Sequence, residues 1–367
     1  MILLRYLILE TFESQIGVLF VLVLIFVSQQ FIKILAQAIN GVIPPDLVLT
    51  LLYLNLPTLA TLMLPISFFL SVLFSHGRLH SESEMVAMTS CGYSPNNVLK
   101  ATMVLATFTF AVAAYNSLYL APAAEDQMTS VIENAKADAG TATLIEGRFH
   151  KTSDNGSVVY VEKYTKGKNL KKIFAAHWPK KAGEAPSVLT AVKGKIESRY
   201  DGTWLTLSDG QRYAGKAGEN EFDKSEFKHY ELHIQNREVE NKKRGVSALP
   251  SNKLIGSHNR QYQAELQWRI ALPLSILLIT FMAVPLAKIN PRHGRYSKLL
   301  PALALYLTYF LLLSTAKSFI EDGVLPITSI WAVQLLFFGA GLILHLHSLG
   351  LMTQKQKATK KTVKSAL

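Results

Sequence analysis

The sequence predicts an α-helical membrane protein with six transmembrane helices, three on each side of an inserted β domain. Six apolar runs support this prediction, because each is close to the ~20 residues that a helix needs to cross a bilayer. A water-soluble core has no use for six such runs. The polar stretch between the third and fourth runs has the size of one folding unit. The runs cover residues 15–36, 47–74, 98–120, 270–287, 299–316 and 324–346.

Basic residues indicate on which side of the membrane each loop lies. Loops 37–46 and 319–323 contain no Lys or Arg, whereas the other loops and the tail are basic. The positive-inside rule therefore predicts that both termini are cytoplasmic and that the β domain lies outside. Anionic lipid explains the net charge of +12, so no nucleic-acid partner is required. The basic residues on the predicted cytoplasmic side are Arg5, Arg78, Lys100, Lys288, Arg292, Arg295, Lys298, Lys355, Lys357, Lys360, Lys361 and Lys364.

The chain divides into four regions by composition. They are an N-terminal transmembrane half (1–122), a β domain with helical or linker flanks (123–262), a C-terminal transmembrane half (263–348) and a basic tail (349–367). Within the second region the apolar residues alternate over short stretches, which is typical of strands. Gly-containing turns between them favour a β-sandwich or jelly roll. Strands are expected at 157–161, 171–176, 204–207 and 230–234, with turns at 154–156, 201–202 and 209–210.

Motifs for catalysis and metal binding are missing from the sequence. It contains no phosphate-binding G-x-x-x-x-G-K-[ST] loop, no G-x-S-x-G and no H-E-x-x-H. His150, His177, His229 and His233 lack the spacing of a metal site. We therefore predict no catalytic residue, no cofactor and no metal, and we expect that the chain is not an enzyme. A membrane protein of this kind signals, acts as a scaffold or is driven by a partner.

The loop after the second apolar run is predicted to form a short helix over about 81–92. Ser81 and Glu84 have the spacing of a capping box, and Gly92 suits the helix end. Met85 and Met88 would share one face with a pliable surface that fits a partner's groove. A helix in this position is typical of the coupling helix of an ABC transporter. The alternative is a connecting turn with favourable caps.

Read together, several short motifs resemble the LptF/LptG permease family over essentially the whole chain. The order and spacing of the motifs are more specific than any one of them. The motifs are Arg5-Tyr6-Leu7, Gly77-Arg78-Leu79, Glu82-Ser83-Glu84, Cys91-Gly92, Val284-Pro285-Leu286, Asn290-Pro291-Arg292, Gly294-Arg295 and Leu300-Pro301-Ala302.

The resemblance implies a transmembrane subunit of an ABC transporter in the bacterial inner membrane, with a periplasmic β-jellyroll domain. Its partners would be the homologous permease LptG in a heterodimer, two copies of the ATPase LptB, and LptC with the periplasmic bridge. The substrate would be lipopolysaccharide, driven out by ATP hydrolysis in LptB. The loop helix would dock on LptB, and an acidic side chain there could pair with a basic residue of the ATPase. The residues implied in this contact are Ser81, Glu82, Glu84, Met85 and Met88.

Two lysines at the outer ends of spans are candidates for the phosphates of an anionic lipid. Lys33 and Lys317 break the positive-inside trend, on the spans that the family uses to line its cavity. The alternative is snorkelling, in which the lysine stem lies along lipid. Gln30 stands where some relatives carry a further basic residue. Apolar candidates for the cavity wall, which would suit lipid-facing positions equally well, are Phe26, Phe31, Leu307, Phe310 and Leu311.

Two other functions are compatible with the spans. A scaffold or mechanotransmission protein would couple the β domain to a cytoplasmic ATPase without moving a substrate. An ion-coupled transporter would need acidic groups within the spans, where the sequence has almost none. Pro57, Pro65, Pro273 and Pro285 fall within predicted spans, where they would either help a cavity to open or act as passive bends.

Overall fold

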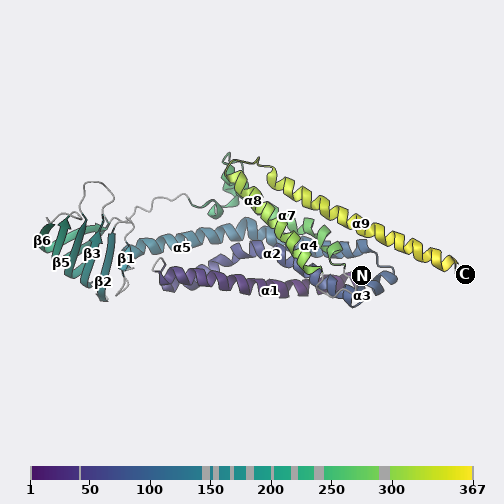
Figure 1. Cartoon of the computed structure of the whole chain (residues 1–367), viewed down its shortest axis with the longest axis horizontal. Coiled ribbons are helices and arrows are strands. Elements are labelled where there is room, and N and C mark those ends of the chain that lie inside the picture. The colour runs from purple at the N-terminus through teal and green to yellow at the C-terminus, as the bar shows by residue number, and fades with distance from the viewer. Residues whose placement is uncertain are drawn as a thin grey trace. The chain divides into compact units, whose positions relative to one another are not determined.

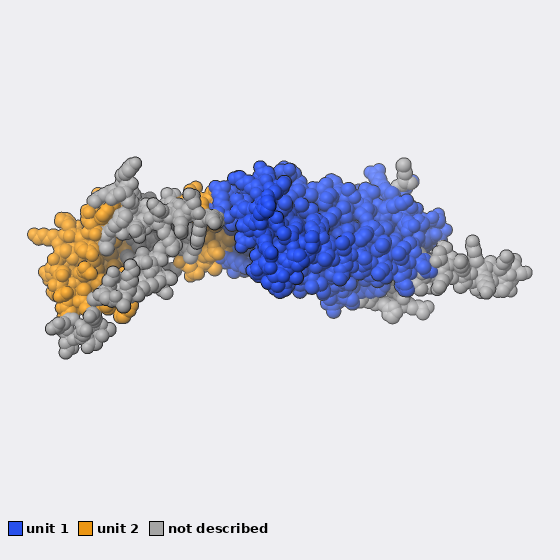
Figure 2. All heavy atoms as spheres, turned by 90° about the horizontal axis from the view of Figure 1, so that it is seen from above, with its two compact units in different colours: residues 1–33, 50–129, 244–367 blue, residues 34–49, 130–243 orange. Residues whose placement is uncertain are grey.

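The computed structural model describes residues 2–40, 43–142, 149–151, 157–165, 169–178, 186–199, 202–215, 222–234, 244–288 and 298–365. The chain forms two compact units, coloured separately in Figure 2. One comprises Met1–Lys33, Thr50–Thr129 and Arg244–Leu367, and the other comprises Ile34–Leu49 and Ser130–Lys243. The first unit contains the helical core, and the second contains the sheet.

The six predicted spans are confirmed, since six described helical segments are long and apolar enough to cross a membrane (Figure 1). Most extend beyond the apolar runs, because polar residues continue the helices at their ends. The segments are α1 (Ile2–Ile39), η1–α2 (Pro45–Leu47 and Val48–Ser81), α4–η2–α5 (Pro95–Tyr115, Asn116–Leu120 and Ala121–Ala142), α7 (Arg260–Leu286), α8 (Leu299–Glu321) and α9 (Ser329–Ser365).

Helix α7 is the most buried span of the helical unit, and it packs against α4, α8 and α9. Polar side chains join these helices within an otherwise apolar core. Tyr309 on α8 donates a hydrogen bond to Gln334 on α9 at 3.0 Å, and Gln334 donates to the carbonyl of Ala271 on α7 at 2.8 Å. Each bond satisfies a group that has no water available in the hydrocarbon. The three helices are therefore tied together by hydrogen bonds as well as by packing.

The four prolines lie inside helices, two in α2 and two in α7. Next to Pro57, Asn116 of the π-helical turn η2 donates to the Pro57 carbonyl at 2.8 Å and to Thr61 at 2.9 Å, which ties the third span to α2. The next residue, Ser117, donates to the carbonyl of Arg269 at 3.0 Å. Proline removes a ladder hydrogen bond, and single π-turns often occur at functional positions. The two roles predicted for these prolines, to help a cavity open or to act as passive bends, both stay predictions.

The inserted β domain is confirmed as one antiparallel sheet of six described strands. Each strand pairs with its neighbour in the sequence, so the strand order refines the expected jelly roll to an up-and-down arrangement among the described residues. Its buried core consists of Val161, Leu170, Ile173, Leu189, Ala191, Leu205 and Leu207. The strands are β1 (Phe149–Lys151), β2 (Ser157–Thr165), β3 (Asn169–His177), β4 (Ser187–Arg199), β5 (Gly202–Gly215) and β6 (Phe222–Ile234).

The turn expected at 209–210 is wrong, because Asp209 and Gly210 lie inside β5. Ser208 pairs with His229 and Gly210 pairs with Phe227, so the register with β6 is the same on both sides of Asp209, which has a φ of 55°. Asp accepts a positive φ more readily than most residues and is common in turns, so Asp-Gly fits a turn as well as an irregular position inside a strand. The turn expected at 154–156 and the first residue of that at 201–202 lie outside the described residues.

Gly341 allows α9 to approach α7 closely. A Cβ at this position would lie 2.7 Å from Met282 Cγ and 3.3 Å from the Met282 backbone nitrogen, whereas a Cβ at Gly339 meets nothing within 4 Å. We expect Gly341→Val to destabilise the helical unit by about 1–3 kcal/mol through overpacking. Thermal unfolding of the detergent-purified protein should show a lower midpoint for this variant. The matched control is Gly339→Val, and equal midpoints for the two variants would contradict the packing argument.

Candidate functional site

Helices α7 and α8 bring two cations and one carboxylate together, which we call the Glu265 cluster: Glu265, Arg269 and Lys317. Arg269 Nε donates to Glu265 Oε1 at 2.9 Å, and Lys317 Nζ donates to Glu265 Oε2 at 2.7 Å. Glu265 is 7% exposed and Arg269 is 3% exposed, whereas the Lys317 side chain remains 23% exposed. The Lys317 ammonium also lies 5.2 Å from the centroid of the Trp268 ring, within cation–π range.

The guanidinium of Arg269 uses all five of its N–H donors. Besides Glu265, it donates to the carbonyl oxygens of Val246, Ser247 and Leu249 and to the hydroxyl of Ser251, at distances of 2.8–3.3 Å. These acceptors belong to the segment of η3 (Val246–Ala248) and α6 (Ser251–Leu254), which precedes α7. A buried charge is tolerated when its hydrogen bonds are complete, as they are here. Arg269 thereby fixes both the chain entry into α7 and the position of Glu265.

Sequence reasoning missed Glu265 and Arg269, because it started this span at residue 270, whereas α7 starts at Arg260. A signal was present in the Glu-to-Arg spacing of i, i+4 directly before an apolar run. On a helix this spacing places the two side chains on one face in the favourable order, with the acid nearer the N-terminus.

The predicted substrate residues fall into two groups. On α8, Lys317 belongs to the Glu265 cluster, and Phe310, seven residues earlier on the same face, lies 6.1 Å from Trp268 between ring centroids. Leu307 and Leu311 on α8 are exposed, as are the α1 residues Phe26, Phe31 and Lys33. No hydrogen bond, ion pair or ring contact joins the α1 group to the α8 group among the described residues. The structure therefore places Phe310 and Lys317 together and leaves Lys33 on a separate helix.

The loop helix is present as α3 (Glu84–Ser90), but the predicted capping box is wrong. Helix α2 continues to Ser81, whose hydroxyl donates to the Arg78 carbonyl at 2.9 Å, so it does not cap α3. Serine often makes this backbone bond in the last turn of a helix. Ser83, with a φ of 63°, separates the two helices. The predicted end is confirmed, since Gly92 has a φ of 87° and Tyr93 N–H bonds to the Met88 carbonyl at 3.0 Å, as in a Schellman motif.

The methionine face of α3 points inward. Met85 and Met88 are 3% and 7% exposed and belong to the core of the helical unit, so they are not the surface offered to a partner. The i, i+3 spacing could not reveal this, because a core face and a docking face have the same period. From Glu82 to Ser90, the exposed residues are Glu82, Ser83, Val86, Ala87 and Ser90.

Helix α1 is tied to α2 and α3 by polar contacts near its start. Tyr6 Oη donates to Glu84 Oε2 at 2.8 Å, and Arg78 forms an ion pair with Glu10 at 2.5 Å. One turn further, Ser75 donates to Thr11 at 3.1 Å in a buried position. Glu84 Oε1 has no hydrogen bond among the described residues and can still accept one from a cation. Glu84 therefore links α3 to α1 through Tyr6.

Two lysines meet where α7 ends and α8 begins. Lys298 Nζ donates to the Lys288 carbonyl at 2.5 Å. Burial and the neighbouring charge of Lys298 lower the pKa of the Lys288 ammonium, since both disfavour its charged form. The intervening family motifs, from Asn290 to Gly294 and Arg295, lie outside the described residues. This end of the two helices is thus basic even without that loop.

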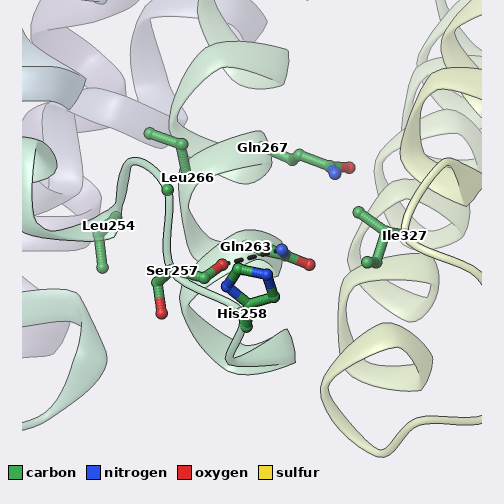
Figure 3. A pocket seen from close by; sticks show the side chains of 8 residues that line it. Leu254, Ser257, His258, Gln263, Leu266, Gln267 and Ile327 are labelled. Atoms are coloured by element: carbon green, nitrogen blue, oxygen red, sulfur yellow. Dashed lines mark hydrogen bonds between the residues drawn. The ribbon is translucent and has the colours of Figure 1, made fainter.

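A pocket of about 430 Å³ lies at the first turns of α7 (Figure 3). Gln263 donates to the Ser257 carbonyl at 2.8 Å, and Gln267 extends toward Ile327. No Lys or Arg lines the pocket, and its glutamines lie two residues along the helix from Glu265 and Arg269, on the opposite face. The pocket is thus separate from the Glu265 cluster, and His258 is the one side chain in its lining that can carry a positive charge.

A family model described as "Lipopolysaccharide export system permease LptF/LptG" matches residues 5–347. The chain belongs to the LptF/LptG family. It is 37% identical over 348 residues to the lipopolysaccharide export system permease protein LptF of Escherichia coli (strain K12) and equally to that of Shigella flexneri. These matches cover 94% of this chain and 95% of each relative. The resemblance predicted from the LptF/LptG motifs is confirmed, and the multi-pass helices and inserted sheet agree with it.

The completeness of the Arg269 hydrogen bonds makes a testable prediction. Arg269→Met removes five donors and leaves Glu265 buried beside Lys317 alone, so we expect a loss of about 3–5 kcal/mol, typical of a broken buried pair. The yield and thermal midpoint of the purified protein should fall sharply. Arg260→Met is the matched control, since Arg260 is exposed on the same helix and makes one backbone bond, to Gly323. Similar losses for both variants would contradict a special role of Arg269.

Proposed function

We propose that the chain is the transmembrane subunit of an ABC transporter that extracts lipopolysaccharide from the bacterial inner membrane. It passes the lipid to a periplasmic bridge, and ATP hydrolysis in a partner subunit drives the step. The observation that carries this proposal is the family match over residues 5–347, together with its relatives, which are named as permeases of lipopolysaccharide export. Lys317, a partly exposed cation on an apolar helix, supports an anionic lipid as the substrate.

The burial of the spans supports a partnership with the homologous permease LptG. Only 6% of the apolar window of α1 and 28% of that of α8 is buried within this chain, compared with 61% for α7. Helices α1 and α8 thus have wide apolar faces for a second permease and for acyl chains. Phe26, Phe31, Leu307, Phe310 and Leu311 would form the wall, and Lys33 and Lys317 would bind phosphates. Two LptB copies and LptC complete the proposed assembly.

The proposed orientation places both termini in the cytoplasm and the β domain in the periplasm. Its support is the positive-inside distribution of the basic residues. Lys288 and Lys298 then lie at the same cytoplasmic surface as α3, while Lys33 and Lys317 lie toward the periplasm. This arrangement separates the ATPase contact from the phosphate contact by the thickness of the membrane.

The energy input enters through α3 and its flanks in this proposal. Glu84, with Ser81 and Glu82 beside it, would contact LptB, and an unoccupied Glu84 oxygen is available for a basic partner. Because Tyr6 binds the other oxygen, movement of α3 would reach α1, the helix that carries Lys33. The buried Met85 and Met88 would support α3 from within instead of contacting the ATPase.

Replacing the two lysines tests the substrate assignment. We expect Lys33→Ala and Lys317→Ala each to reduce ATP-driven lipopolysaccharide transport several-fold in proteoliposomes containing the complete complex, and the double variant to reduce it further. The reason is the loss of charge-assisted bonds to phosphate. Lys100→Ala, at the opposite end of a span, is the control. Transport at the wild-type rate in the double variant would rule out phosphate binding by these lysines.

Replacing Glu84 tests the coupling assignment. Glu84→Ala should lower the amount of lipopolysaccharide moved per ATP hydrolysed, because the ATPase motion would no longer reach α1. The ratio is measured in the same proteoliposomes from parallel phosphate-release and transport assays. Glu13→Ala, an exposed acid on α1, should keep the wild-type ratio. An unchanged ratio in Glu84→Ala would remove Glu84 from the coupling contact.

A further inference from the structure

Lys317 is not a free cation, although it is a candidate for phosphate binding. Its ammonium donates to Glu265 Oε2 at 2.7 Å, and Glu321, one turn further along α8, lies at 3.7 Å. An anionic substrate that binds Lys317 must therefore compete with a carboxylate of the protein itself. Lys33 differs, because it is exposed and makes no ion pair within the described residues.

Glu265 is held in place independently of Lys317. Its other oxygen accepts from Arg269, whose remaining four N–H groups bind the segment from Val246 to Ser251. Glu265 therefore has little freedom to follow Lys317 when the lysine moves. The shared carboxylate is a fixed point, and Lys317, with its long and partly exposed side chain, is the mobile partner.

The division of the two carboxylate oxygens makes an exchange feasible. If a phosphate draws Lys317 away, Glu265 keeps its bond to Arg269 and is not left as an unpaired buried charge, which would be costly. When the phosphate leaves, the same carboxylate oxygen is available to bind Lys317 again. The geometry thus allows Lys317 to alternate between an internal and an external anion.

We propose that Glu265 is a positioning residue that competes with an anionic lipid phosphate for Lys317 and so promotes release of the substrate. This inference rests on the proposed function, in which Lys317 binds a phosphate of lipopolysaccharide. A transport site must release its cargo, and a lysine without a competing anion would retain a polyphosphorylated lipid longer. Arg269 supports the competition by fixing the carboxylate, and Trp268 supports it by holding the ammonium at its ring.

The test uses the complete complex in proteoliposomes, with a photocrosslinking residue in place of Leu311 on α8. Two quantities are measured. The first is the fraction of protein that irradiation crosslinks to lipopolysaccharide before ATP is added. The second is the rate at which the fraction captured falls in samples irradiated at successive times after ATP is added. Glu265→Gln keeps the size of the side chain and an acceptor for Arg269 but removes the charge. We expect it to raise the crosslinked fraction and to slow its decay, each about several-fold.

Two further variants separate competition from a purely structural role. Glu321→Gln removes the more distant carboxylate and should remain close to wild type. Adding Glu265→Gln to the Lys317→Ala protein should change neither the crosslinked fraction nor its rate of decay any further. The reason is that no ammonium remains for which a carboxylate and a phosphate could compete. If Glu265→Gln lowers the yield of folded complex, Glu265→Asp replaces it, because the shorter carboxylate lies farther from Lys317 and should also raise occupancy.

The outcomes distinguish this inference from the proposed function. Wild-type occupancy and decay in Glu265→Gln, with reduced crosslinking in Lys317→Ala, would overturn the competition and leave the substrate site intact. An additional effect of Glu265→Gln in the Lys317→Ala protein would also overturn it, because the glutamate would then act by another route. Unchanged crosslinking in Lys317→Ala would overturn the substrate role of Lys317 and the competition together.

Discussion

Arg269 joins three parts of the helical unit. The five N–H groups of its side chain bind Glu265 and the segment entering α7, and its backbone carbonyl accepts a hydrogen bond from Ser117 at the π-turn of the third span. A buried guanidinium has no water available to it, so each donor must find an acceptor within the protein. These hydrogen bonds fix the start of α7 and the position of Glu265. Glu265 in turn holds Lys317.

The helical unit combines a well-covered centre with sparsely covered outer helices. Helix α7 is linked to α8 and α9 through Tyr309 and Gln334, and it is mostly buried. Helix α1 is mostly uncovered, yet its start is tied to α2 and α3 through Tyr6, Glu10 and Thr11. In the proposed function, this combination would let a push at α3 change the position of α1 relative to the buried centre.

The sequence predicted the features that depend on long patterns or on special backbone angles. Six hydrophobic runs gave six spans, and Gly92 marked the end of α3 because few other residues accept its positive φ. Features that depend on which neighbour lies across a contact could not be predicted. The sequence around Met85 and Met88, around Ser81 and around Asp209 fits two local structures equally well in each case, and tertiary packing selected one.

The site shows the same division. Lys317 stood out in the sequence as a charge at the end of an apolar run, but its partners did not, because Glu265 lies more than 50 residues away and at the polar margin of its span. The pairing of α7 with α8 that brings them together is a property of the fold. An anion that binds Lys317 must compete with Glu265, and the packed structure is needed to see that this lysine is already paired.

The most direct test of the account is whether substrate passes along α8 under control of the ATPase. A photocrosslinking residue in place of Phe310 would be compared in cells with an active LptB and with an LptB that binds but does not hydrolyse ATP. We expect lipopolysaccharide adducts in both, with a clear difference in their amount between the two, because the nucleotide cycle empties the site. Adducts absent from both, in a complex that is folded and assembled, would contradict the account and favour a scaffold that moves no lipid.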